Sequence, residues 1–139
     1  MKAVVFSGTI EGRVFSRQLA ALGAEVLVSV ATPLGAEEQG KADGISVHCG
    51  RLTTEEMTTL LQGAALCVDA THPYAVDATK NIRAACAVVG VEYHRLLREE
   101  SPLPAGSMVF ATAAHAAAFL AGCSGNVLLA TGAKELAAF

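Results

Sequence analysis

The sequence predicts an α/β fold: a doubly wound parallel sheet of the Rossmann type, followed by the start of a second α/β lobe. Apolar residues gather in short uncharged runs, which suit strands that are buried on both faces. These runs alternate with stretches of helical periodicity. A glycine-containing turn at residues 7–9 follows the first run directly.

The first thirty residues predict a βαβ unit. We expect a strand at residues 2–6, a helix at 10–22 and a second strand at 25–30. Gly23 is placed to end the helix, because glycine readily adopts the left-handed conformation found just beyond helix ends.

The middle of the chain continues the alternation. Residues 32–44 are polar and contain glycines, so we expect a loop there with at most a helical turn. A short strand at 45–48 follows, and then a helix that begins at Thr53 or Thr54 and runs to residue 62.

The last part of this lobe predicts a strand at 66–69, a helix at 75–89 that ends before Gly90, and a strand at 91–95. Right-handed crossovers then give the strand order 3-2-1-4-5.

The acidic, proline- and glycine-bearing segment EESPLPAG changes the character of the chain, and we interpret it as a linker. Beyond it we expect the beginning of a truncated second lobe, with strands at 108–111 and 126–130 and a helix at 113–121. The predicted organisation is a cofactor lobe at 1–98, a linker at 99–107 and the start of the second lobe at 108–139.

Composition excludes several classes of protein. The formal net charge is −3, Lys and Arg form no run, and Trp is absent, so nothing indicates a nucleic-acid partner. No apolar stretch is long enough for a membrane span, although 53% of the residues are hydrophobic. The chain enters directly into a strand without a signal peptide, and we expect a cytoplasmic location. No ligand spacing for zinc is present, so no metal site is predicted.

Ligands of open parallel sheets bind beyond the carboxyl ends of the strands. Four loops are expected there, and each carries hydroxyls, glycines or cations: 7–13, 29–32, 50–51 and 71–74. In the first, Ser7, Gly8 and Thr9 precede a helix N-terminus, where free N–H groups favour phosphate. In the same helix, Glu11 is either a contact of the cofactor or only a partner of the helix dipole. Arg13 is either a contact of the cofactor or only a solvated surface charge.

The end of the second strand indicates which nicotinamide cofactor is used. NAD sites usually place a carboxylate there to bind the ribose 2′-hydroxyl, whereas this chain has Ser29 and Thr32. Because a carboxylate would repel a 2′-phosphate and Arg51 or Arg13 would attract it, NADP(H) is favoured.

The segment Asp69-Ala70-Thr71-His72-Pro73-Tyr74 follows the fourth strand and is typical of a ligand-facing turn. His72 is a candidate for orienting a substrate carboxylate or supplying a proton near neutral pH. The alternative is structural: Asp69 caps the loop, Pro73 starts the helix and Tyr74 packs against the sheet.

Together, FSGTIEGR, VSVATPLGAE, GRL, VDATHPYA and the final TGAKEL resemble the precorrin-6A reductase family of cobalamin biosynthesis, which includes the enzymes for the cobalt-containing substrate. The family commonly opens with Gly-Gly-Thr-x-Glu, and here Ser7 replaces the first glycine. Members of the family are longer and have a complete second lobe.

The resemblance implies an NADPH-dependent reductase that transfers hydride to a ring double bond of a tetrapyrrole, precorrin-6A. It places Gly8 and Thr9 at the pyrophosphate, and Ser29 and Thr32 near the adenosine ribose. The remaining implied contacts are Gly50 and Arg51 beside the cofactor, Thr71, His72 and Tyr74 at the cleft, and Thr131, Gly132 and Lys134 on the opposite wall from the second lobe.

Two other functions stay open from the sequence. One is a different NADP(H) oxidoreductase of the extended Rossmann group, although Lys80 lies six residues after Tyr74 and breaks the Tyr-x-x-x-Lys spacing of short-chain dehydrogenases. The other is a nucleotide-binding domain without catalysis. The sequence does not determine the oligomeric state, the proton donor or whether the substrate carries cobalt.

Overall fold

Five parallel strands form one sheet in the order β3-β2-β1-β4-β5, as the sequence predicts. The sheet belongs to a computed structural model that describes residues 1–98 and 102–139. The strands are β1 (Lys2–Phe6), β2 (Glu25–Val30), β3 (Ile45–Cys49), β4 (Leu66–Asp69) and β5 (Glu92–Arg95).

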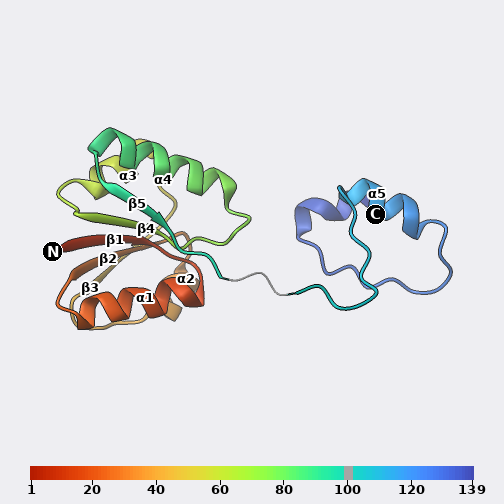
Figure 1. Ribbon diagram of the computed structural model, residues 1–139, viewed down its shortest axis with the longest axis horizontal. Coiled ribbons are helices and arrows are strands. Elements are labelled where there is room, and N and C mark those ends of the chain that lie inside the picture. The colour runs from red at the N-terminus through yellow and green to blue at the C-terminus, as the bar shows by residue number, and fades with distance from the viewer. Residues whose placement is uncertain (99–101) are drawn as a thin grey trace. The chain divides into compact units, whose positions relative to one another are not determined.

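Helices cover both faces of this sheet, with α1 and α2 on one side and α3 and α4 on the other (Figure 1). Two apolar cores result, one on each face, and Val4 and Val5 of the central strand point into opposite ones. The helices are α1 (Ile10–Ala21), α2 (Pro33–Gln39), α3 (Thr54–Leu61) and α4 (Val76–Val89).

Local capping sets where the helices begin and end. The Thr9 hydroxyl accepts a hydrogen bond from the Gly12 amide at 3.1 Å and begins α1. Thr53 is the cap of α3, since its side chain and that of Glu56 each bind the other's backbone amide in a capping box. Gly90 adopts the left-handed conformation and ends α4.

The expected loop at 32–44 contains a seven-residue helix, α2, so the prediction of at most a helical turn is wrong. Thr32 is its N-cap and accepts a hydrogen bond from the Gly35 amide at 3.1 Å, while Pro33 occupies the first turn. Threonine followed by proline is a helix-start signal that the sequence carried.

Contacts within the chain divide it into two units, Met1–Glu99 and Glu100–Phe139. The proposed domain boundaries stay a prediction, because residues 99–101 of the expected linker lie outside the described residues. In the described part of the second unit, α5 (Ala113–Leu120) forms where a helix was expected, and a 3-10 helix, Ala133–Ala138, follows. No helix of the described residues is both long and apolar enough to span a bilayer.

The strands expected at 108–111 and 126–130 are wrong: neither segment is a strand in the described residues. Apolar residues alone do not make a strand, because its backbone N–H and C=O groups need a neighbouring strand to bind. Val109 and Leu128 are 74% and 93% exposed, so these segments also lack the burial that the prediction assumed.

Gly12 brings α1 close to the carboxyl ends of β1 and β4. A Cβ atom at this position would lie 2.6 Å from Ser7 Oγ and 2.8 Å from the Ala70 Cβ, both shorter than normal contacts. The helix therefore rests on the two strands with no space for a side chain. Close helix–strand packing is one of the roles of glycine in dinucleotide-binding turns.

We expect Gly12→Ala to destabilise the chain by about 1–3 kcal/mol, the usual cost of overpacking. The sign of this change in stability is informative, because glycine-to-alanine changes inside helices ordinarily stabilise a protein by up to about 1 kcal/mol. Chemical denaturation followed by circular dichroism measures the free energy of unfolding. Gln18→Ala, at an exposed position of the same helix, is the control, with an expected change within about 0.5 kcal/mol. A stabilised Gly12→Ala variant would contradict the tight contact.

Candidate functional site

The strand register aligns one residue from each strand in a row across the carboxyl end of the sheet. The paired residues are His48, Ser29, Phe6, Asp69 and Arg95, in sheet order from β3 to β5. The four loops predicted to carry the site all leave the sheet at this edge. The row is polar except at its centre, and the strand order reverses beside that centre, between β1 and β4.

The loop after β1 is bound to its neighbours on both sides. The Ser7 amide donates to the Ser29 carbonyl at 2.8 Å, and the Thr9 hydroxyl donates to the Ala70 carbonyl at 3.0 Å. Gly8 has a φ of +150°, and a Cβ atom there would meet nothing within 4 Å. The turn is therefore fixed at its ends and open at Gly8, with the N-terminus of α1 directly after it.

Glu11 and Arg13, the two charged candidates on α1, both contact other parts of the chain. Arg13 Nη1 donates to the Glu38 carbonyl at 3.1 Å, which joins α1 to the end of α2. Glu11 Oε1 lies 3.8 Å from Nε of Arg98, in the segment after β5.

The candidates at the ends of β2 and β3 lie beside each other. Ser29 is buried, whereas Thr32 is exposed and caps α2. The Gly50 amide donates to the Val30 carbonyl at 2.9 Å, and the exposed Arg51 follows it. The structure thus brings together the residues expected near the adenosine ribose and leaves the Arg51 side chain in solvent.

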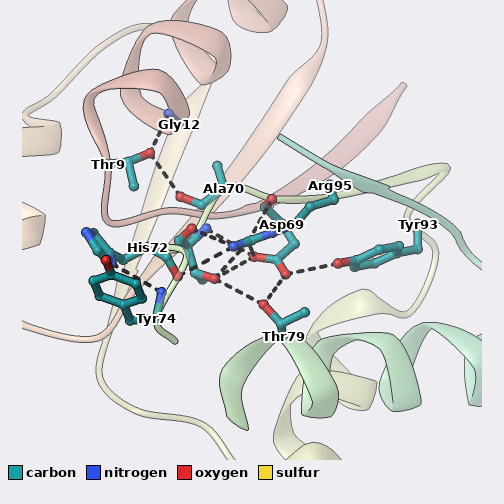
Figure 2. Close-up of polar contacts among 10 residues, drawn as sticks. Thr9, Gly12, Asp69, Ala70, His72, Tyr74, Thr79, Tyr93 and Arg95 are labelled. Carbon is teal, nitrogen blue, oxygen red and sulfur yellow. Dashed lines mark hydrogen bonds and ion pairs between the residues drawn. The ribbon is translucent and has the colours of Figure 1, made fainter. Parts of the chain in front are cut away.

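The carboxylate of Asp69 is fully buried at this edge and is surrounded by hydrogen-bond donors (Figure 2). It forms an ion pair with Arg95. Its oxygens also accept hydrogen bonds from the Thr71 amide at 3.0 Å, the Thr71 hydroxyl at 2.7 Å, the Thr79 hydroxyl at 2.8 Å and the Tyr93 hydroxyl at 3.0 Å. A buried carboxylate requires such compensation, because it has lost its hydration.

Arg95 binds the backbone of the loop after β4 as well as the Asp69 carboxylate. Its Nη1 donates to the Asp69 carbonyl at 3.2 Å and to the Thr71 hydroxyl at 2.9 Å. Its Nη2 donates to the carbonyl of Thr71 at 3.0 Å and to that of His72 at 3.5 Å. One guanidinium therefore binds three residues of this loop, Asp69, Thr71 and His72.

His72 and Tyr74 point away from this cluster (Figure 2). Their ring centroids are 5.0 Å apart, and the Tyr74 amide donates to His72 Nδ1 at 3.3 Å. Tyr74 is 88% exposed, so the alternative that it packs against the sheet is wrong. A second part, Asp69 as the cap of the loop, agrees with its two hydrogen bonds from Thr71. The third part is wrong, because Pro73 does not start the helix: α4 begins at Val76, with Ala75 as its N-cap.

The candidates from the end of the chain belong to the second unit. Thr131 and Gly132 are exposed there, and the side chain of Lys134 lies outside the described residues.

Sequence reasoning missed Thr79, Tyr93, Arg95 and the packing role of Gly12. Counting residues back from the carboxyl end of each parallel strand would have paired Arg95 with Asp69, since both close their strands. His48 lies beside Ser29 in the row, and its buried Nδ1 has no hydrogen-bond partner among the described residues.

The chain is similar to known proteins in both sequence and structure. A family model described as "Precorrin-6x reductase CbiJ/CobK" matches residues 2–139. The cobalt-precorrin-6A reductases of Priestia megaterium and Salmonella typhimurium are 33% and 35% identical over 139 residues, covering 98% and 96% of this chain. A solved structure, "CobK precorrin-6A reductase", superposes with a TM-score of 0.69 at 28% identity over 89% of this chain and 49% of that one. The chain spans about half the length of the curated relatives it matches, 54% and 52%.

Tyr93 gives a test of the Asp69 cluster. Burial, together with the charge of Asp69 and the hydrogen bond to it, raises the pKa of Tyr93 from 10.0 to about 12. The folded chain thus keeps this phenol protonated to higher pH than the unfolded chain does. Its contribution to stability is complete below about pH 10 and is lost as the pH rises through about 12.

The chain has two tyrosines and no tryptophan, so absorbance resolves this titration. In Tyr74→Phe, the phenolate absorbance of Tyr93 should appear with a midpoint near 12. Tyr93→Phe, which retains Tyr74, provides the reference titration. Between about pH 10 and 12, the free energy of unfolding should fall less steeply with pH in Tyr93→Phe than in the unaltered chain. A midpoint for Tyr93 at the ordinary value of 10.0 would show that the buried hydrogen bond is absent.

Proposed function

Because the chain belongs to the precorrin-6x reductase CbiJ/CobK family, we propose that it forms the cofactor lobe of a reductase. The reaction is hydride transfer from NADPH to a ring double bond of precorrin-6A, or of its cobalt form, in cobalamin biosynthesis. The observation that carries the proposal is the meeting of the four predicted loops at one edge of the sheet, where the strand order reverses.

The turn after β1 fits the pyrophosphate of a dinucleotide. Gly8 leaves its backbone accessible, and α1 contributes the positive end of its dipole. The Thr9 hydroxyl already donates to Ala70 and accepts from Gly12. We therefore assign phosphate binding to the backbone N–H groups of this turn and give the Thr9 side chain the role of holding it in place. Ser7, whose amide is bound to β2, and Glu11 border the same site.

The preference for NADPH is assigned to Arg51. The segment from Ser29 to Thr32 has no carboxylate that would repel a 2′-phosphate. Of the two arginines considered, Arg13 is bound to the Glu38 carbonyl, whereas Arg51 is exposed beside Gly50. A guanidinium is suited to phosphate, which it can bind through two parallel hydrogen bonds.

The substrate would lie against the loop after β4. Thr71 borders the cofactor, and the exposed rings of His72 and Tyr74 face the macrocycle. His72 offers a contact to a substrate carboxylate, or a proton near neutral pH. By resemblance to the family, Thr131, Gly132 and Lys134 would contact the macrocycle from the second lobe. The bound cofactor supplies the hydride, and these side chains supply orientation and charge.

A second candidate function is binding of the dinucleotide without turnover. The residues assigned to the cofactor all lie in the first unit, whereas Thr131, Gly132 and Lys134, which are expected at the substrate, belong to the second unit. Intact NADPH binding in a chain that does not oxidise NADPH in the presence of precorrin-6A would favour this function over the reductase.

Titration calorimetry of this chain with NADPH and with NADH tests the cofactor site. We expect tighter binding of NADPH, and a roughly tenfold or greater loss of NADPH affinity in Arg51→Ala, from a lost charge-assisted contact of about 1.5 kcal/mol or more. NADH affinity should stay unchanged, because NADH has no 2′-phosphate.

Lys80→Ala is the control, since it removes an exposed positive charge from α4. An equal loss in Arg51→Ala and Lys80→Ala would indicate a general charge effect and contradict the role of Arg51. Failure of the unaltered chain to bind either nucleotide would contradict the cofactor site in this chain.

A further inference from the structure

The contacts of Arg95 converge on one short segment. Both terminal nitrogens of its guanidinium donate to residues 69, 71 and 72, through backbone carbonyls and the side chains of Asp69 and Thr71. The side chain of Arg95 is only 19% exposed, so little of it is available to a ligand. Its position at the edge of the candidate site is therefore better explained by its contacts with this segment than by direct contact with a ligand.

Arginine suits this role because its nitrogens form a rigid planar fork. Nη1 reaches Asp69 and the Thr71 hydroxyl, while Nη2 reaches the carbonyls of Thr71 and His72. A lysine would keep the charge opposite Asp69 but would present a single nitrogen. Substitution of Arg95 by lysine can therefore keep the ion pair with Asp69 while it removes the hydrogen bonds to the backbone carbonyls.

The buried side of the segment is fixed while its other side carries the exposed rings. The carbonyls of Thr71 and His72 turn toward Arg95, and the rings of His72 and Tyr74 point away from it (Figure 2). The Ala75 amide donates to the His72 carbonyl at 2.9 Å, which connects the segment to the start of α4. The position of both rings therefore depends on the anchor beneath them.

We propose that Arg95 is a positioning residue: through Asp69 and the backbone of Thr71 and His72, it fixes the rings of His72 and Tyr74 in the orientation that the reaction uses. This inference rests on the proposed function for its catalytic consequence. The role of Arg95 in holding the segment is a separate claim that can be measured without substrate.

The first measurement is the mobility of the segment. Because the chain has no tryptophan, Tyr74→Trp places a single fluorescent reporter on it, and time-resolved anisotropy reports its local motion. In this background we expect Arg95→Lys to add a fast decay component. Arg95→Gln combined with Asp69→Asn should do the same without leaving an unpaired buried charge.

Arg17→Gln is the matched control. Arg17 Nη2 donates to the Gln39 carbonyl at 3.0 Å, so this variant also loses a guanidinium-to-carbonyl bond, but in the layer of α1 and α2. It should leave the anisotropy decay unchanged. Circular dichroism confirms that each variant compared is folded.

The second measurement is steady-state reduction of precorrin-6A by NADPH in the otherwise unaltered chain, with Tyr74 retained. Arg95→Lys should lower kcat by on the order of a hundredfold, since small displacements of positioning groups have effects of this size. The Kd for NADPH should change far less than kcat, because the contacts of Arg95 are with Asp69, Thr71 and His72 and not with the turn after β1. A purely stabilising role would lower kcat only in proportion to the folded fraction, which circular dichroism measures, so a hundredfold loss in a folded variant would not follow from it.

The outcomes separate the two claims. If the anisotropy decay in the Tyr74→Trp background is the same with and without Arg95→Lys, the proposal is overturned. A loosened segment with unchanged kcat would overturn it too, because the rings would then not need the anchor. If the unaltered chain binds no NADPH or shows no reduction, the proposed function fails in this chain, and the anisotropy comparison still decides whether Arg95 holds the segment.

Discussion

A parallel sheet that is covered by helices on both faces offers ligands only the ends of its strands. In this chain the interior of the sheet is apolar on both sides, and polar residues appear where the strands end. Everything that gives the site its chemistry has to be placed within one or two residues of those ends. The pairing of the strands consequently determines which polar groups meet, because residues opposite each other in the register share a level of the sheet.

This constraint explains the contrast between the two sides of the central crevice. On the β1 side, the turn is built from small residues, with Gly8 open to solvent and Gly12 leaving no space beneath the helix. On the β4 side, a fully buried carboxylate gathers donors from α4, β5 and its own loop. The first side leaves its backbone open at Gly8, whereas the charged groups of the second side bind one another and hold a loop. Thr9 joins them through its hydrogen bond to Ala70.

The sequence was sufficient to predict the sheet order and the position of the edge, because buried strands, helix caps and glycine stops are local signals. The family resemblance, carried by VDATHPYA and four other segments, is confirmed by the family model. The apolar segments around Val109 and Leu128 showed the limit of local reasoning, since a strand also needs a partner. Arg95 was missed for a related reason: it lies 26 residues from Asp69, and only the register brings the two together.

The pairing of Asp69 with Arg95 has a consequence for how the sheet is assembled. β5 is the outermost strand on its side, so among the described strands it pairs with β4 alone. A slip of one residue would place His94 or Leu96 opposite the buried carboxylate and would turn the solvent-facing side of β5 inward. Neither neighbour provides a permanent positive charge. The ion pair therefore also selects one alignment of the last strand, so that errors in its addition to the sheet are penalised by an unpaired charge.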